Sequence, residues 1–99
     1  MDRITNKHLE AQIKYLNDIT GSPETPWARG DDGKLVANVG NYHLSGAYGG
    51  VCVHRMENEH GGVSTPITYG HVPKRELHGK LRAYIDGIEH GLNQANNGS

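Results

Sequence analysis

A glycine- and tyrosine-rich stretch over residues 40–62 contains many of the side chains that are suited to contacting a ligand. It reads GNYHLSGAYGGVCVHRMENEHGG, with few apolar side chains able to fill a core. Glycine lets the backbone approach a planar ligand closely because it has no Cβ atom. Tyr42 and Tyr48, with Tyr69 farther along, offer rings that can stack on such a ligand. The alternative interpretation is that these glycines serve only as turn residues.

The second chemically suggestive feature is the charge order along the C-terminal helix that we predict below. Apart from Glu76, which is spaced to pair with Lys80, cationic side chains occupy its first half and carboxylates its second half: Lys74, Arg75, Lys80, Arg82, Asp86 and Glu89. This order opposes the helix dipole, so helix stability does not explain it. We expect Lys74 and Arg75 to bind an anion together with the free N–H groups there, with Arg55 and His71 extending the site. The alternative is an ordinary solvated helix face.

Metal binding and nucleophilic catalysis receive little support from the pattern. Cys52 and His54 share one face of a predicted strand, where they could ligate a metal with His60 or His71, but the usual paired ligand spacing is missing. A Cys–His nucleophilic pair also needs an orienting group and an oxyanion hole, and neither can be placed. There is no GxxxxGK[ST] phosphate loop. We therefore expect no catalytic residue, no metal and no cofactor.

Helical periodicity predicts two helices that would position these residues. In residues 5–19, Leu9, Ile13 and Leu16 recur at helical spacing, and Thr5 is placed to cap the start. A second helix is predicted over residues 73–92, with Pro73 at its first position. Its apolar stripe comprises Leu77, Leu81, Tyr84, Ile85, Ile88 and Leu92. The tail over residues 93–99 is expected to fray.

Short, partly alternating segments between the two helices predict strands. They form an antiparallel meander over about residues 34–69, separated by glycine-rich turns. A short hairpin is also predicted between residues 25–29 and 34–39, closed by a DDG turn. A helix over residues 51–59 is the alternative, which the valines disfavour. In the strand, Val51 and Val53 mark the face that packs on the core.

These elements predict one α+β domain over residues 1–99, with a small antiparallel sheet of three to four strands flanked by an N-terminal and a C-terminal helix. The hydrophobic fraction is only 34% and there are 14 glycines, so the core is small. We therefore expect a homo-oligomer or a bound ligand to add stability.

The charge balance and the lack of long apolar runs limit the classes of partner. Ten basic and eleven acidic residues give a net charge of −1, which disfavours nucleic acid and anionic membrane as partners. No apolar run approaches a membrane span or the core of a signal peptide, and the single cysteine excludes an intrachain disulfide. We expect a cytoplasmic location.

Three segments resemble a group of small proteins encoded by tailed bacteriophages: GNYHLSGAYGG with HRMENEHGGV, then GHVPKREL, then AYIDGI. The resemblance covers roughly residues 35–90 and implies no catalytic residue. It implies a protein that acts in the cytoplasm of an infected bacterium. Small non-enzymatic phage proteins of this kind often inhibit a host factor or capture a nucleotide signal of antiviral defence.

The function that we predict is therefore non-enzymatic binding of an anionic small molecule such as a nucleotide. The predicted ligand-binding residues are Tyr42, Tyr48, Arg55, Tyr69, His71, Lys74 and Arg75. An inhibitor that docks on a host protein is the alternative, because interfaces concentrate tyrosine, tryptophan and arginine. A nucleic-acid-binding protein ranks third, and an enzyme ranks last.

Overall fold

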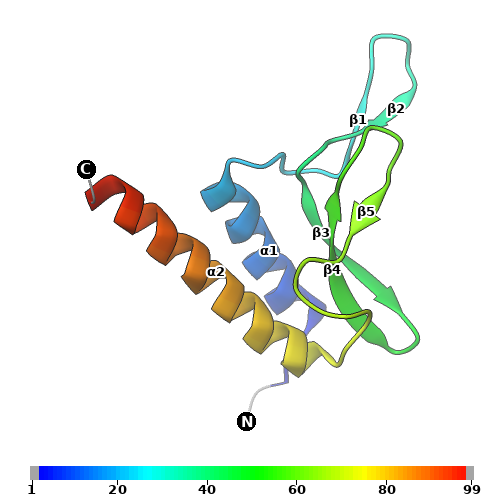
Figure 1. Cartoon of the computed structure of the whole chain (residues 1–99). Helices are drawn as coiled ribbons and strands as arrows, with labels where there is room; N and C mark the ends of the chain where they lie inside the picture. Colours follow the sequence, from blue (N-terminus) through cyan, green and yellow to red (C-terminus); the bar gives the residue numbers. More distant parts are fainter. Residues whose placement is uncertain (1–2, 98–99) are drawn as a thin grey trace.

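The computed structural model describes residues 3–97 and contains two helices and two small antiparallel sheets (Figure 1). This confirms the α+β fold with a helix before and after the strands. In chain order the elements are α1 Asn6–Thr20, β1 Trp27–Arg29, β2 Leu35–Ala37, β3 Tyr42–Ala47, β4 Gly50–Met56, β5 Val63–Ser64 and α2 Lys74–Asn97.

Helix α1 begins and ends at residues whose chemistry favours helix termini. The Thr5 side chain accepts a hydrogen bond from the His8 N–H, and the His8 ring accepts one from the Thr5 N–H. Gly21 ends the helix with φ 66°, in the left-handed region that glycine tolerates. The buried face of α1 contains Leu9, Ile13, Leu16 and Asn17.

The three-stranded sheet has the order β3–β4–β5, which makes β4 the central strand. Residues 50–56 are thus a strand, and the helix considered as an alternative for this segment is absent. Val51 and Val53 belong to the hydrophobic core, as predicted. Cys52 and Met56 on the other face are buried as well. β4 is flanked by β3 on one side and by β5 and Val72 on the other.

The strands do not form the single meander that the sequence indicated. β2 pairs with β1 in a separate two-stranded sheet, which confirms the short hairpin. The last predicted strand keeps only Val63–Ser64, and the chain then runs irregularly until Val72 forms a bridge with Val51. Pro66 interrupts this segment, and proline has no N–H to donate to a sheet.

Helix α2 differs from the prediction at both ends. Pro73 precedes the helix and its carbonyl accepts a hydrogen bond from the Leu77 N–H, so Pro73 is the capping residue and Lys74 the first helical one. The helix continues to Asn97, so residues 93–97 are helical where a frayed tail was predicted; residues 98–99 lie outside the described part of the chain. The apolar stripe ends at Leu92, but residues 93–97, NQANN, contain neither proline nor glycine to stop the helix.

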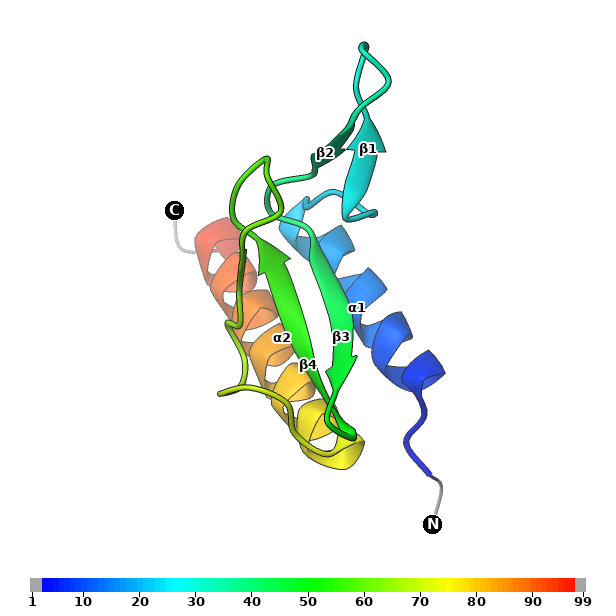
Figure 2. The same ribbon diagram turned by 90° about the vertical axis from the view of Figure 1, so that its right-hand side faces the viewer.

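Both helices pack on the same face of the three-stranded sheet, and neither covers the opposite face (Figure 2). The core between these layers includes five fully buried aliphatic side chains: Leu9, Leu16, Val53, Leu77 and Leu81. The sheet therefore presents its outer face, with the even-numbered residues of β4, away from the helices.

Candidate functional site

The turn between β3 and β4 holds a tyrosine in a backbone conformation that tyrosine disfavours. Ala47 pairs with Gly50, which leaves Tyr48 and Gly49 as a two-residue turn with φ 53° and 75°. Positive φ at both positions defines a type I′ turn, where asparagine or glycine is usual. Tyr48 is also 101% exposed, so its ring adds almost no packing to the fold. A bulky side chain that strains the backbone without packing is a reason to look for a function there.

A row of aromatic rings runs from this turn across the outer face of the sheet. Ring centroids are 6.3 Å apart for Tyr48 and His71, 6.4 Å for His71 and His54, and 5.6 Å for His54 and His43. Each neighbouring pair is arranged edge to face. We call Tyr48, His71, His54 and His43 the aromatic row.

Burial keeps part of the aromatic row uncharged. Desolvation lowers the pKa of His43, and the neighbouring His54 lowers it further. Desolvation and the neighbouring His71 likewise lower the pKa of His54. The His71 ring also has a buried Nε2 atom that hydrogen-bonds to no other group in residues 3–97. At neutral pH the rings of His43 and His54 are therefore uncharged groups that stack and form hydrogen bonds.

The cationic start of α2 lies at the same end of the sheet as Tyr48. Val51 and Val72 exchange two backbone hydrogen bonds of 2.8 Å, which holds the chain just before α2 against β4. The beginning of α2 and the β3–β4 turn adjoin in both ribbon views (Figures 1 and 2). Lys74 and Arg75 are exposed there. The N–H groups of the first turn have no partner within a helix, so they add positive potential.

Tyr69 is the least constrained of the predicted ligand-binding residues. It lies two residues before His71 in the irregular segment and is 105% exposed. Tyr69 precedes by three residues Val72, which bridges Val51, so its backbone lies within about 10 Å of that bridge. Tyr48, Tyr69, His71, Lys74 and Arg75 thus form the group that the fold brings together, which we call the Tyr48 end.

Tyr42 and Arg55 do not belong to this group. They pair with each other at the far end of the β3–β4 ladder. Six residues separate Tyr42 from Tyr48, and that length of strand is about 20 Å. Tyr42 is only 7% exposed, so its ring cannot stack on a ligand from solution.

The functional groups of Tyr42 and Arg55 are also already engaged. The Tyr42 hydroxyl lies 3.3 Å from that of Tyr84, and burial followed by this contact raises the pKa of Tyr84 to about 12. The Arg55 guanidinium lies over the Tyr42 ring and forms a 2.8 Å ion pair with Glu57. The prediction that these two residues contact the same ligand as Tyr48 does not fit this geometry, because strand register sends them to the opposite end.

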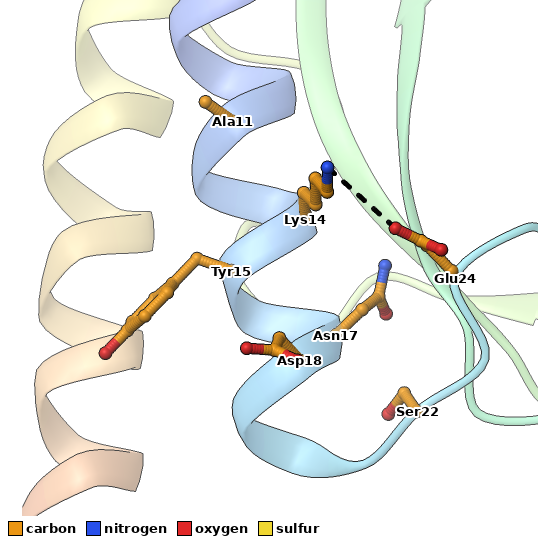
Figure 3. Close-up of a pocket in the computed structure, with 7 residues that line it drawn as sticks. All are labelled: Ala11, Lys14, Tyr15, Asn17, Asp18, Ser22 and Glu24. Carbon is orange, nitrogen blue, oxygen red and sulfur yellow. Dashed lines mark ion pairs between the residues drawn. The ribbon is translucent and has the colours of Figure 1, made fainter.

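Two depressions lie elsewhere, beside α1. One, of about 580 Å³, is lined by Ala11, Lys14, Tyr15, Asn17, Asp18, Ser22 and Glu24 (Figure 3). Lys14 and Glu24 face each other across it at 4.0 Å. A second, of about 270 Å³, lies between α1 and β3, and Tyr42 is the only predicted ligand-binding residue that lines either one. The Tyr48 end is an open surface by comparison.

Cys52 and His60, which the sequence offered for metal binding or nucleophilic chemistry, lie in very different surroundings. Cys52 is fully buried, and desolvation raises the pKa of its thiol while a hydrogen bond from Ser45 lowers it by less. His60 is exposed in the loop between β4 and β5. Among residues 3–97, no group of three or more histidine, cysteine, aspartate or glutamate side chains is placed to hold a metal ion.

Sequence reasoning missed His43 as a member of the aromatic row. The signal was present, because a two-residue turn at Tyr48 and Gly49 sets His43 directly opposite His54. The prediction placed all of residues 46–50 in a glycine-rich turn and assigned no register across it, so the two histidines were not paired.

Comparison of the chain with protein-family models, curated proteins and solved structures returns no match. Neither helix of the described chain is long and apolar enough to span a membrane.

Proposed function

We propose that this protein is a non-enzymatic binding protein that captures an anionic aromatic small molecule, such as a nucleotide, at the Tyr48 end. The observation that carries the proposal is Tyr48 itself, a fully exposed ring held at φ 53° beside a cationic helix start. Left-handed backbone costs a residue with a side chain about 1–2 kcal/mol. A ring that stacks on a ligand gives a reason for keeping tyrosine there.

In this proposal each residue of the Tyr48 end has a defined part. Tyr48 and Tyr69 stack on the base, and base–aromatic stacking contributes about 1–3 kcal/mol per base. Lys74 and Arg75 bind the phosphate together with the first N–H groups of α2. The His71 ring lies edge to face with the Tyr48 ring and supports it from the side of the sheet. Tyr42 and Arg55 stabilise the fold and take no part.

The setting of the proposal comes from the resemblance to phage proteins. In the cytoplasm of an infected bacterium, a protein that captures a nucleotide signal would blunt antiviral defence. Capture needs tight non-covalent binding and no covalent reaction, and the stacking and cationic groups at the Tyr48 end are suited to that. We further propose that the protein works as a homo-oligomer, because its small core gains stability from assembly.

Calorimetric titration with a panel of linear and cyclic nucleotides tests this function. We expect one or more to bind, Tyr48→Ala to weaken binding about tenfold or more, and Lys74→Glu with Arg75→Glu to do the same. Lys80→Glu with Arg82→Glu is the matched control, since it changes the same charge on the same helix farther from Tyr48. Absence of heat across the panel, or equal losses in the control, would refute the proposal.

One observation favours a second candidate, an inhibitor that docks on a host protein. Tyr48 and Tyr69 stand free on an open surface and line neither of the two depressions, which suits a protein surface. Affinity capture from bacterial lysate with wild type and with Tyr48→Ala, Tyr69→Ala protein separates the candidates. A single partner lost with the double variant, together with no nucleotide binding, supports docking; no such partner removes this candidate.

A further inference from the structure

One edge of the three-stranded sheet presents backbone groups that no strand covers. β3 lies at that edge. Val51 exchanges its backbone hydrogen bonds with Val72, on the side of β4 away from β3. Because bonded and non-bonded pairs alternate along an antiparallel ladder, His43, Ser45 and Ala47 bond to β4. The N–H and C=O groups of Tyr42, Leu44 and Gly46 therefore point outward from the edge.

Within residues 3–97, the protein covers the first of these three positions and leaves the other two open. The buried Asn17 side chain donates to the Tyr42 carbonyl and accepts from the Tyr42 N–H, both at 2.9 Å, as a neighbouring strand would. For Leu44 and Gly46, no hydrogen bond to the outward N–H or C=O occurs in the described chain. Two residues of a strand edge, one half-buried and one exposed, remain free to pair.

β3 also lacks the devices with which proteins protect such edges. Charged side chains, proline and bulges normally block pairing there. Residues 43–47 read HLSGA and contain no charged side chain and no proline. Gly46 adds no side chain, and a Cβ atom placed on it would meet only the Gly50 carbonyl oxygen, at 3.7 Å. The edge is therefore open to a second backbone.

A groove with matching chemistry runs beside this edge. It is the depression of about 270 Å³ between α1 and β3, in which Ile13 and Leu44 are apolar and Glu10 and Glu24 outnumber Lys14. The larger depression shares Lys14 and Glu24 and adds the carboxylate of Asp18. An occupant of the groove thus meets an apolar floor and an excess of negative charge.

The shape of the layer beneath the edge distinguishes the possible occupants. Helix α1 extends sideways past β3 (Figure 2), so the space next to the edge has α1 as its floor. A second copy pairing through its own β3 would bring its own α1 into the space that this α1 already occupies, and the two helices would clash. A single extended segment has no helix beneath it and therefore fits beside the edge.

We propose that the β3 edge binds an extended peptide segment as an added strand. Its backbone pairs with Leu44 and Gly46, an apolar side chain packs on Ile13, and a basic side chain faces Glu10 and Glu24. Asn17 ends the site by occupying the next position. This inference does not depend on the nucleotide proposal, since it uses a different edge and different residues.

Selection of peptides from a random displayed heptapeptide library tests this site. Immobilised wild-type protein is the bait, and binders are depleted on Gly46→Pro protein, whose proline has no N–H and fills the edge with its ring. We expect enriched peptides to contain basic and apolar residues in alternation. A synthetic enriched peptide should bind Gly46→Pro at least about tenfold more weakly than wild type, whereas Gly46→Ala, which keeps the N–H, should bind within about threefold.

Two further measurements keep the test decisive if Gly46→Pro folds poorly. Glu10→Lys with Glu24→Lys leaves the backbone unchanged and should weaken the same peptide about tenfold. In nuclear magnetic resonance spectra, the peptide should shift the Leu44 and Gly46 amide signals and leave the Ser45 amide, which bonds to β4, nearly unchanged. No enrichment, enriched acidic peptides, unaltered binding to the variants, or shifts confined to the Tyr48 end would each overturn the proposal.

Discussion

Tyr48 combines full exposure with a strained backbone, and this combination links stability to the proposed function. We predict that Tyr48→Asn raises the free energy of unfolding by about 0.5–1 kcal/mol, because asparagine tolerates positive φ and the exposed ring contributes little packing. Urea denaturation measures the change, and the same variant should lose nucleotide binding. Tyr69→Asn is the control, since Tyr69 is equally exposed without a positive φ and should change stability by less than about 0.5 kcal/mol.

The lowered pKa values of His43 and His54 predict how stability depends on pH. In the unfolded chain these imidazoles titrate near the ordinary pKa of 6.5, whereas burial lowers the pKa of both in the folded protein. Below about pH 6.5 the unfolded chain therefore binds more protons, so stability is full above that pH and falls as the solution is acidified.

Denaturation at pH 5, 6, 7 and 8 checks this dependence. We expect a smaller loss between pH 7 and pH 5 in a His43→Gln, His54→Gln variant than in wild type. His71 and Asn41 are the polar neighbours of these two rings and are unchanged in the variant. An identical pH profile for both proteins would show that the aromatic row does not determine the acid sensitivity.

At the scale of elements, helix α2 contains glycines at positions where the structure has room for a side chain. Gly79 and Gly87 are exposed within the helix, and a Cβ atom built on either meets nothing within 4 Å. Alanine stabilises a helix interior by about 0.8–1 kcal/mol relative to glycine. We predict that Gly79→Ala and Gly87→Ala each raise the free energy of unfolding by roughly this amount in thermal or urea denaturation.

Gly21→Ala is the matched control for those substitutions. Its Cβ atom also has open space, but Gly21 sits at φ 66° at the end of α1, so alanine there should destabilise the protein by about 1 kcal/mol. The contrast separates backbone conformation from packing. If Gly79→Ala or Gly87→Ala lowered stability, that glycine would instead be needed for a close contact with another molecule.

At the scale of the whole molecule, the β1–β2 hairpin projects from the body (Figures 1 and 2). The radius of gyration is 14.7 Å, above the roughly 13 Å of a compact 100-residue domain. The hairpin attaches mainly through the Ala37 N–H, which donates to the Glu59 carbonyl, and through Trp27, which packs beside Gly61. A two-stranded hairpin alone is marginally stable in water.

Hydrogen exchange read by mass spectrometry should therefore show a clear order of protection. We predict that amides of β1 and β2 exchange well before those of β3 and β4, because few buried contacts hold the hairpin. Equal protection of both pairs would contradict this and would indicate that another chain covers the hairpin in solution. Repeating the measurement at several protein concentrations distinguishes that case.

The sequence by itself determined the local structure and the fold class. Both helices followed from apolar spacing, and the strand character of residues 50–56 followed from the valines, because these signals act within a few residues of the chain. The basic start of α2 and the exposed tyrosines of the Tyr48 end were also recognisable as residue types. The helix continued past the predicted end because residues 93–97 contain neither proline nor glycine.

Only the tertiary structure decided which of these residues meet. Register placed Tyr42 and Arg55 about 20 Å of strand away from Tyr48, and it aligned His43 with His54, although all of them lie in one glycine-rich stretch. The open edge of β3 and the groove beside it exist only once α1 packs under the sheet. Contacts between residues far apart in sequence depend on strand pairing and layer packing, which composition and periodicity do not encode.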